Sequence, residues 1–310
     1  MALKIVFMGT PDFAVPCLES LIKSNHNVAA VFTQPDKPVG RKHILTAPPV
    51  KQCAQQYGIP VYQPESVKKD DTALNIIKEI APDIIVVVAY GKLLPNEILT
   101  AAPLGCINIH ASLLPKYRGA SPVQWAIVCG EKTTGVTAMR LDEGMDTGDI
   151  LQMSECEIGE RDTAIDMFDK LSALGAKLLC DTLLGLRNGT ITPIKQDSSI
   201  ATYAPIIEKQ DGQIDFTKSA HEISCLIRGL VIWPVAHTYV EGKRLKIYAA
   251  DEVCCEKGEC GDIITQDGEI IVKCGGNTAI RITDLQLEGS KRMSAKDFLN
   301  GRRLNAEHLQ

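Results

Sequence analysis

Two polar side chains that can act on a carbonyl group stand close together in an otherwise apolar run, Cys106-Ile107-Asn108-Ile109-His110. The alternation of polar and apolar residues is the period of a strand, so Asn108 and His110 lie on one face. Turn-forming residues follow at once, namely Ser112, Pro115, Gly119 and Pro122. The two side chains are therefore expected at the carboxyl end of a strand, where open α/β sheets place their chemistry. An isolated Asn-x-His is also compatible with a hydrogen-bonded amide and a core histidine.

The strands that must position this pair are expected in the first part of the chain. Residues 3–9 form an apolar strand that runs into a helix capped by Thr10 and Pro11. The run 83–89 lacks polar alternation, which predicts a strand covered on both faces of a doubly wound, parallel-rich sheet. The first turn contains one glycine, Gly9, so the Gly-x-Gly-x-x-Gly fingerprint of nicotinamide and flavin sites is absent. Further strands are expected at 27–33 and 134–141, and helices at 50–57, 72–80, 122–129 and 163–187.

The pattern changes in the last third of the chain. Residues 190–205 contain turn formers and a polar run, and are interpreted as a linker. Beyond it, one helical segment at 221–230 precedes short alternating strands with glycine turns, which predict a small β-barrel. The expected domains are therefore 1–189 and 206–310.

The composition indicates a globular protein with a sizeable core. The chain has 310 residues, of which 45% are hydrophobic and 23% charged. No apolar run is long enough to span a bilayer, and the first residues enter a strand, so a cytoplasmic protein is expected. The 11 cysteines fit reduced thiols better than a disulfide framework. The net charge of −5 means that any RNA contact must come from local basic patches.

Two segments resemble the signature of folate-dependent formyltransferases, one from Asn108 to Gly119 and the other from Leu141 to Ile150. Further matches at Gly9–Ala14, Tyr203–Pro205 and Trp233-Pro234 are similar to the methionyl-tRNA formyltransferase family. The resemblance covers nearly the whole chain. It implies a Rossmann-like formyltransferase domain, 1–189, followed by an OB-like tRNA-binding β-barrel domain, 206–310. One departure is Val231-Ile232, where the family commonly has Asn-Pro.

The resemblance also implies an activity, which is transfer of the formyl group of 10-formyltetrahydrofolate to the α-amino group of initiator methionyl-tRNA. It assigns Asn108, His110 and Asp146 to catalysis. The folate-contacting turn is expected at Ser112, Leu113, Leu114 and Pro115, and tRNA contacts at Arg41 and Lys42. We expect a monomer with no membrane partner.

Metal and covalent chemistry are not expected. Cys254, Cys255, Cys260 and Cys274 lack the paired spacing of a structural zinc site. Cys106 is expected to point away from Asn108 and His110, and is not proposed as a nucleophile. Two alternatives remain: a formyltransferase that acts on a nucleotide or sugar-nucleotide amine, and a non-catalytic tRNA-binding protein.

Overall fold

The computed structural model describes the chain except residues 1, 41–42, 69–71, 267, 302–307 and 310. Its contacts group the chain into two compact units. Unit 1 consists of Met1–Gly119, Thr134–Glu157 and Phe168–Tyr203, and unit 2 of Ala120–Thr133, Ile158–Met167 and Ala204–Gln310. The predicted domain boundaries at 189 and 206 remain a prediction.

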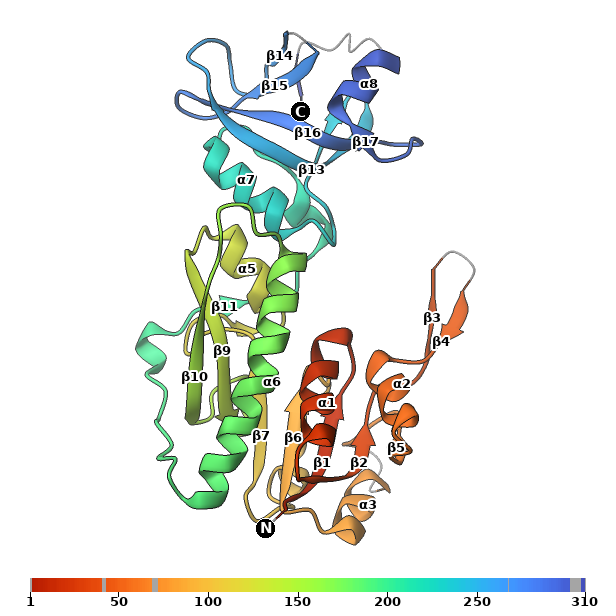
Figure 1. Ribbon diagram of the computed structural model, residues 1–310. Coiled ribbons are helices and arrows are strands. Elements are labelled where there is room, and N and C mark those ends of the chain that lie inside the picture. The colour runs from red at the N-terminus through yellow and green to blue at the C-terminus, as the bar shows by residue number, and fades with distance from the viewer. Residues whose placement is uncertain (1, 41–42, 69–71, 267, 302–307, 310) are drawn as a thin grey trace. The chain divides into compact units, whose positions relative to one another are not determined.

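A seven-stranded sheet forms the centre of unit 1 in the residues that the structure describes (Figure 1). Its strands are β1 (Lys4–Gly9), β2 (Asn27–Phe32), β5 (Val61–Tyr62), β6 (Ile84–Val88), β7 (Cys106–His110), β9 (Thr133–Arg140) and β10 (Ile150–Glu157). The order is β10-β9-β7-β6-β1-β2-β5, with parallel pairs from β7 through to β5 and an antiparallel pair between β7 and β9. The predicted Rossmann-like, parallel-rich sheet is confirmed.

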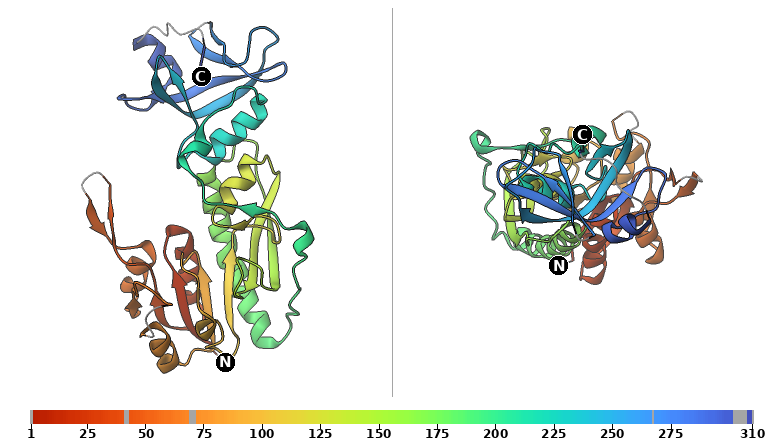
Figure 2. Two further views of the ribbon diagram at one scale, coloured as in Figure 1. Left: turned by 180° about the vertical axis from the view of Figure 1, so that it is seen from behind. Right: turned by 90° about the horizontal axis from the view of Figure 1, so that it is seen from above.

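Helices cover both faces of this sheet, which explains why all five residues of β6 are buried. One face packs against α3 (Thr72–Ile80) and α4 (Asn96–Leu99). On the other face lie α1 (Val15–Lys23), beside α2 (Pro49–Gln56), and α6 (Ala164–Asn188). A Cβ atom at Gly175 of α6 would come within 3.0 Å of Ile109, so glycine allows the close approach of α6 to β7. Seen from behind in Figure 2, α6 lies beyond the strands.

A short β-hairpin follows β2 in the chain. Strands β3 (Lys37–Val39) and β4 (Ile44–Thr46) pair antiparallel. Three-residue strands are too short to show an alternation of polar and apolar residues in the sequence. Arg41 and Lys42, between these strands in the sequence, lie outside the described residues.

Unit 2 contains a curled antiparallel sheet, as expected for an OB-like domain (Figure 1). Its strand order is β12-β13-β16-β15-β14, and β17 pairs with β16. Its elements are α5 (Pro122–Val128), α7 (Ala220–Gly229), β12 (His237–Val240), β13 (Lys243–Cys254), β14 (Ile263–Gln266), β15 (Glu269–Lys273), β16 (Thr278–Leu287), β17 (Met293–Ser294) and α8 (Ala295–Gly301). Helix α7 begins with a capping box between Ser219 and Glu222 and packs against α5 and β13.

Short elements occur within the predicted linker. The two-residue strands β8 (Arg118–Gly119) and β11 (Tyr203–Ala204) pair with each other, and a 3-10 turn covers Ser198–Ile200. Among the described helices, none is long and apolar enough to cross a membrane.

Candidate active site

Asn108 and His110 lie in the last three residues of β7 and are nearly buried, with 9% and 6% of their surfaces exposed. Opposite them on β9 are Met139 and Thr137. The expected strand and the shared face are confirmed. Because the site is shielded, hydrogen-bond donors here act in a low dielectric and have a strong effect on developing charge.

The turn after β7 is held by internal hydrogen bonds. The Thr137 hydroxyl donates to the carbonyl of Ser112 at 2.6 Å and accepts from the amide of Leu114 at 3.1 Å. The Ser112 hydroxyl donates to the carbonyl of Lys116 at 2.6 Å. The bonds made by Thr137 tie the turn to β9, so its position relative to Asn108 and His110 is fixed by the sheet itself.

The carbonyl of Tyr117 determines the protonation of the His110 ring. His110 Nε2 lies 3.0 Å from this oxygen, which can only accept a hydrogen bond, so Nε2 carries a proton. His110 Nδ1 lies 3.6 Å from Asp146 Oδ2. In the neutral ring Nδ1 then has a lone pair, which can accept a proton on the side of Asp146.

Asp146 is held in an uncommon backbone conformation. Its φ of 54° lies in the left-handed region, which costs a non-glycine residue of order 1 kcal/mol. The carboxylate Oδ2 accepts a hydrogen bond from the amide of Gly119 at 2.9 Å. The loop that carries it is closed by Asp142, whose Oδ1 accepts from Gly144 N and Thr147 Oγ1 at 3.0 and 2.7 Å. Asn108, His110 and Asp146 are thus brought to one site, which we call the polar cluster.

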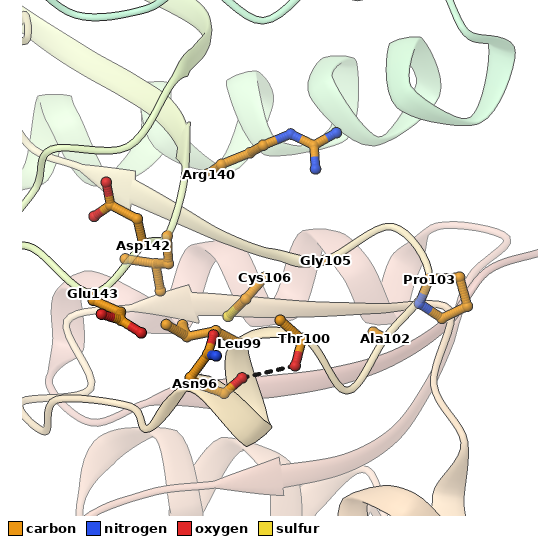
Figure 3. A pocket seen from close by; sticks show the side chains of 11 residues that line it. Asn96, Leu99, Thr100, Ala102, Pro103, Gly105, Cys106, Arg140, Asp142 and Glu143 are labelled. Carbon is orange, nitrogen blue, oxygen red and sulfur yellow. Dashed lines mark hydrogen bonds between the residues drawn. The ribbon is translucent and has the colours of Figure 1, made fainter.

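Figure 3 shows the side chains that line a pocket. The pocket has a volume of about 430 Å³, and its wall includes the start of β7 and of the Asp142 loop, the two segments that also carry the polar cluster. Its wall combines apolar side chains with the start of the loop that carries Asp146. The lining residues are Asn96, Leu99, Thr100, Ala102, Pro103, Gly105, Cys106, Arg140, Leu141, Asp142 and Glu143. The sequence analysis did not predict this pocket, because its wall joins α4, the start of β7 and the end of β9.

Cys106 lines this pocket, and the prediction that it points away from the site was wrong. Residues 106, 108 and 110 are two apart, so a strand places all three on one face. Burial raises the pKa of the Cys106 thiol far above its usual range, so the thiol stays protonated. A protonated thiol is a poor nucleophile, and this supports the prediction that Cys106 has no covalent role.

The folate assignment at 112–115 remains a prediction. Ser112 and Leu114 are buried, whereas Leu113 and Pro115 are half-buried. The Leu114-Pro115 peptide bond is cis. No group of three or more His, Cys, Asp or Glu side chains in the described ranges could hold a metal ion.

Comparison with known proteins shows the family to which the chain belongs. Residues 3–183 match the formyl transferase family model, and residues 206–303 match the model for the formyl transferase C-terminal domain. The chain belongs to the formyl transferase family.

Among curated relatives, the methionyl-tRNA formyltransferase of Lachnospira eligens is 48% identical over 310 residues and covers 98% of each chain. The enzyme of that name from Caldanaerobacter subterraneus is 50% identical over 300 residues, with 96% of this chain and 97% of the relative covered. A solved N-formyltransferase from Helicobacter canadensis, in complex with folinic acid and dTDP-3-aminofucose, has the same fold. Its TM-score is 0.70 and its identity 21%, and the match covers 90% of this chain and 98% of that one.

Proposed function

We propose that this protein transfers the formyl group of 10-formyltetrahydrofolate to the α-amino group of initiator methionyl-tRNA. The observation that carries the proposal is the polar cluster of Asn108, His110 and Asp146 beside an open pocket. Relatives named methionyl-tRNA formyltransferase, 48% to 50% identical over nearly the whole chain, support this choice of acceptor.

The reaction needs hydrogen-bond donors and a route for one proton. The α-amino nitrogen attacks the formyl carbon, and the carbonyl oxygen becomes negative in the tetrahedral intermediate. The Asn108 amide supplies a neutral donor for that oxygen. His110 and Asp146 accept the proton that the attacking nitrogen loses and return it to N10 as the bond between N10 and the formyl carbon breaks. The products are the formylated amine and tetrahydrofolate.

The pocket beside the polar cluster suits the flat pterin group of the donor. Its volume is about 430 Å³, and Leu99, Cys106 and Leu141 give it an apolar wall. Asp142 and Glu143 of the adjoining loop give the same wall polar groups, which we propose hydrogen-bond the ring edge. We propose that the pterin enters here while the turn at Ser112, Leu113, Leu114 and Pro115 contacts the part of the donor nearer the formyl group.

The tRNA contacts are proposed for Arg41 and Lys42 and for cations of unit 2. Arginine offers a planar fork that can bind a phosphate or a base edge, and lysine adds a second positive charge. We further propose that the protein acts in the cytoplasm as a monomer.

Formylation assays test this function. Purified protein is incubated with 10-formyltetrahydrofolate and one of three acceptors: initiator methionyl-tRNA, a nucleotide amine or an amino-sugar nucleotide. We expect formylated product only in the reaction that contains initiator methionyl-tRNA as the acceptor. Transfer to an amino-sugar nucleotide but not to methionyl-tRNA would favour the function of the Helicobacter canadensis enzyme. Binding of tRNA without any formyl transfer would indicate a non-catalytic tRNA-binding protein.

A further inference from the structure

Gln196 is a buried amide that joins two parts of unit 1 far apart in the sequence. It is 7% exposed. Its Nε2 donates hydrogen bonds to the carbonyls of Asp146 and Gly148, at 2.9 and 2.7 Å. Its Oε1 accepts hydrogen bonds from Nε and Nη2 of Arg118 at 3.1 and 2.8 Å. All the hydrogen-bonding groups of this amide are therefore used in fixing two loops of the site.

Arg118 brings a positive charge into this network. Its side chain is 2% exposed, and its guanidinium also approaches the Ser198 hydroxyl at 3.4 Å. A guanidinium stays protonated even when buried. Its bonds to Oε1 polarise the amide of Gln196, which strengthens the two bonds that Nε2 donates.

The same network holds Asp146 from two sides. Gln196 fixes its main chain, whose φ of 54° needs such support. Gly119, the neighbour of Arg118, fixes its carboxylate by donating to Oδ2 at 2.9 Å. The main-chain amide of Arg118 is itself bonded to the carbonyl of Thr202 at 2.9 Å. A shift of Gln196 would thus move the carboxylate that faces His110.

We propose that Gln196, held by the buried Arg118, is a positioning residue for formyl transfer that sets the orientation of Asp146 toward His110. The inference rests on the proposed function, because it concerns how the polar cluster is kept ready for the reaction. It assigns a role to a residue in the segment interpreted from sequence as a linker.

Two substitutions separate positioning from packing. Gln196→Leu removes both donors and the acceptor at similar volume. Gln196→Glu keeps an acceptor for Arg118 but replaces the donors with an oxygen that repels the carbonyls of Asp146 and Gly148. We expect both to lower kcat for methionyl-tRNA by about tenfold to a hundredfold, while KM for either substrate changes less than about threefold. Gln196→Glu keeps the test possible if the leucine variant does not fold.

A matched control comes from Gln152 on β10 in unit 1. Its Oε1 accepts a hydrogen bond from the Thr182 hydroxyl at 2.9 Å. Gln152→Leu also removes an internally bonded glutamine amide, and should leave kcat unchanged even if the melting temperature falls. Equal kcat losses in the Gln152 and Gln196 variants would mean a merely structural effect and overturn the inference.

A double-mutant cycle tests whether the effect passes through Asp146. In an Asp146→Asn background, measured by single turnover with enzyme in excess, Gln196→Leu should lower the rate less than about twofold, because the group it positions is already lost. Fully multiplicative losses would overturn the inference. If the wild type formylates methionyl-tRNA and Gln196→Glu has the same kinetics, the positioning role alone is refuted. If the wild type itself is inactive, the proposed function is refuted.

Discussion

The polar cluster of unit 1 and the outward face of the unit 2 sheet use polar residues in opposite ways. In unit 1, His110 is nearly buried and Asp146 is partly buried, and each is bonded to a main-chain group. In unit 2, alternation along β13 turns Leu245 and Ile247 inward and leaves Arg244 and Lys246 half-buried on the other face. One region fixes a few groups in place, and the other presents charges to solvent.

Cations gather on this outward face of unit 2. Opposite Arg244 and Lys246 on β12 are Tyr239 and His237. Burial lowers the pKa of His237, and the charges of Arg244, Lys209 and Lys246 lower it further, against the raising effect of its hydrogen bond to Val235. Arg244 and Lys246 are the cations of this face that we expect to contact a polyanion. Under the proposed function, fixed geometry serves the site where we expect bonds to break, and adaptable charge serves the face that we expect to bind phosphates.

The largest effect is expected from the polar cluster. Asn108→Ala, His110→Ala and Asp146→Asn should each lower kcat by about a hundredfold or more and leave the fold intact, with losses that are less than additive. The measurement is steady-state formylation of methionyl-tRNA. His221→Ala is the matched control, since His221 also pairs with a carboxylate, Glu252, at 3.1 Å but on the surface of unit 2. If His110→Ala had near wild-type turnover, like His221→Ala, then the polar cluster would have no catalytic role that the surface pair lacks.

The next effect concerns the pocket beside the cluster. Cys106→Phe places a ring into the space proposed for the pterin and should raise KM for the formyl donor by about tenfold, while Cys106→Ala should keep kcat within about twofold. Cys17→Ala is the control, because burial also raises the pKa of that thiol, to about 12, but Cys17 is not among the pocket-lining residues. An unchanged donor KM in folded Cys106→Phe would place the pterin elsewhere.

The cations of unit 2 should contribute less and should depend on salt. The double substitution Arg244→Ala and Lys246→Ala should raise KM for tRNA several-fold and flatten the log-log dependence of tRNA binding on salt by roughly one to two units. Donor KM should not change. Lys23→Ala with Lys218→Ala removes the same charge from two exposed i,i+4 ion pairs and serves as the control. A salt slope equal to that of wild type would show that this face does not bind phosphates.

Arg41 tests a single cation of unit 1 in the same way. Arg41→Ala should reduce productive use of tRNA a few-fold and flatten the salt slope by about one unit, and Arg41→Lys should restore part of the loss because it returns charge without the planar fork. Melting temperature and donor KM report on fold and folate binding, and neither should change. Identical tRNA kinetics for wild type and Arg41→Ala across a salt series would contradict the assignment.

The smallest effect is on stability in mild acid. The unfolded chain takes up a proton at His237 near pH 6.5, whereas the folded chain, with a lowered pKa, does so only at lower pH. The unfolded state therefore binds more protons in this window, and stability falls as pH drops below about 6.5. His237→Asn keeps a donor for the Val235 carbonyl and removes the titration. As the pH is lowered from 7.5 to 5.5, the melting temperature of the wild type should fall towards that of the variant. A difference in melting temperature that stays constant over this range would argue against a neutral His237.

The sequence by itself determined much of the fold and the centre of the site. An unbroken apolar run predicted β6 as a doubly covered strand, and alternation predicted β7 with Asn108 and His110 on one face. Period and turn chemistry are local, so each can be interpreted from a few neighbouring residues. The formyltransferase resemblance added Asp146, which no local pattern links to His110.

The tertiary structure alone decided which distant groups support that centre. The carbonyl that fixes the His110 ring belongs to Tyr117, a residue in the left-handed region with φ 59°. Gln196 reaches Asp146 across 50 residues, and Cys106 reaches the pocket only because α4 and the end of β9 complete its wall. Such contacts form between segments that are far apart in the sequence. Hydrophobic periodicity describes each segment locally, so it does not predict which segments come into contact.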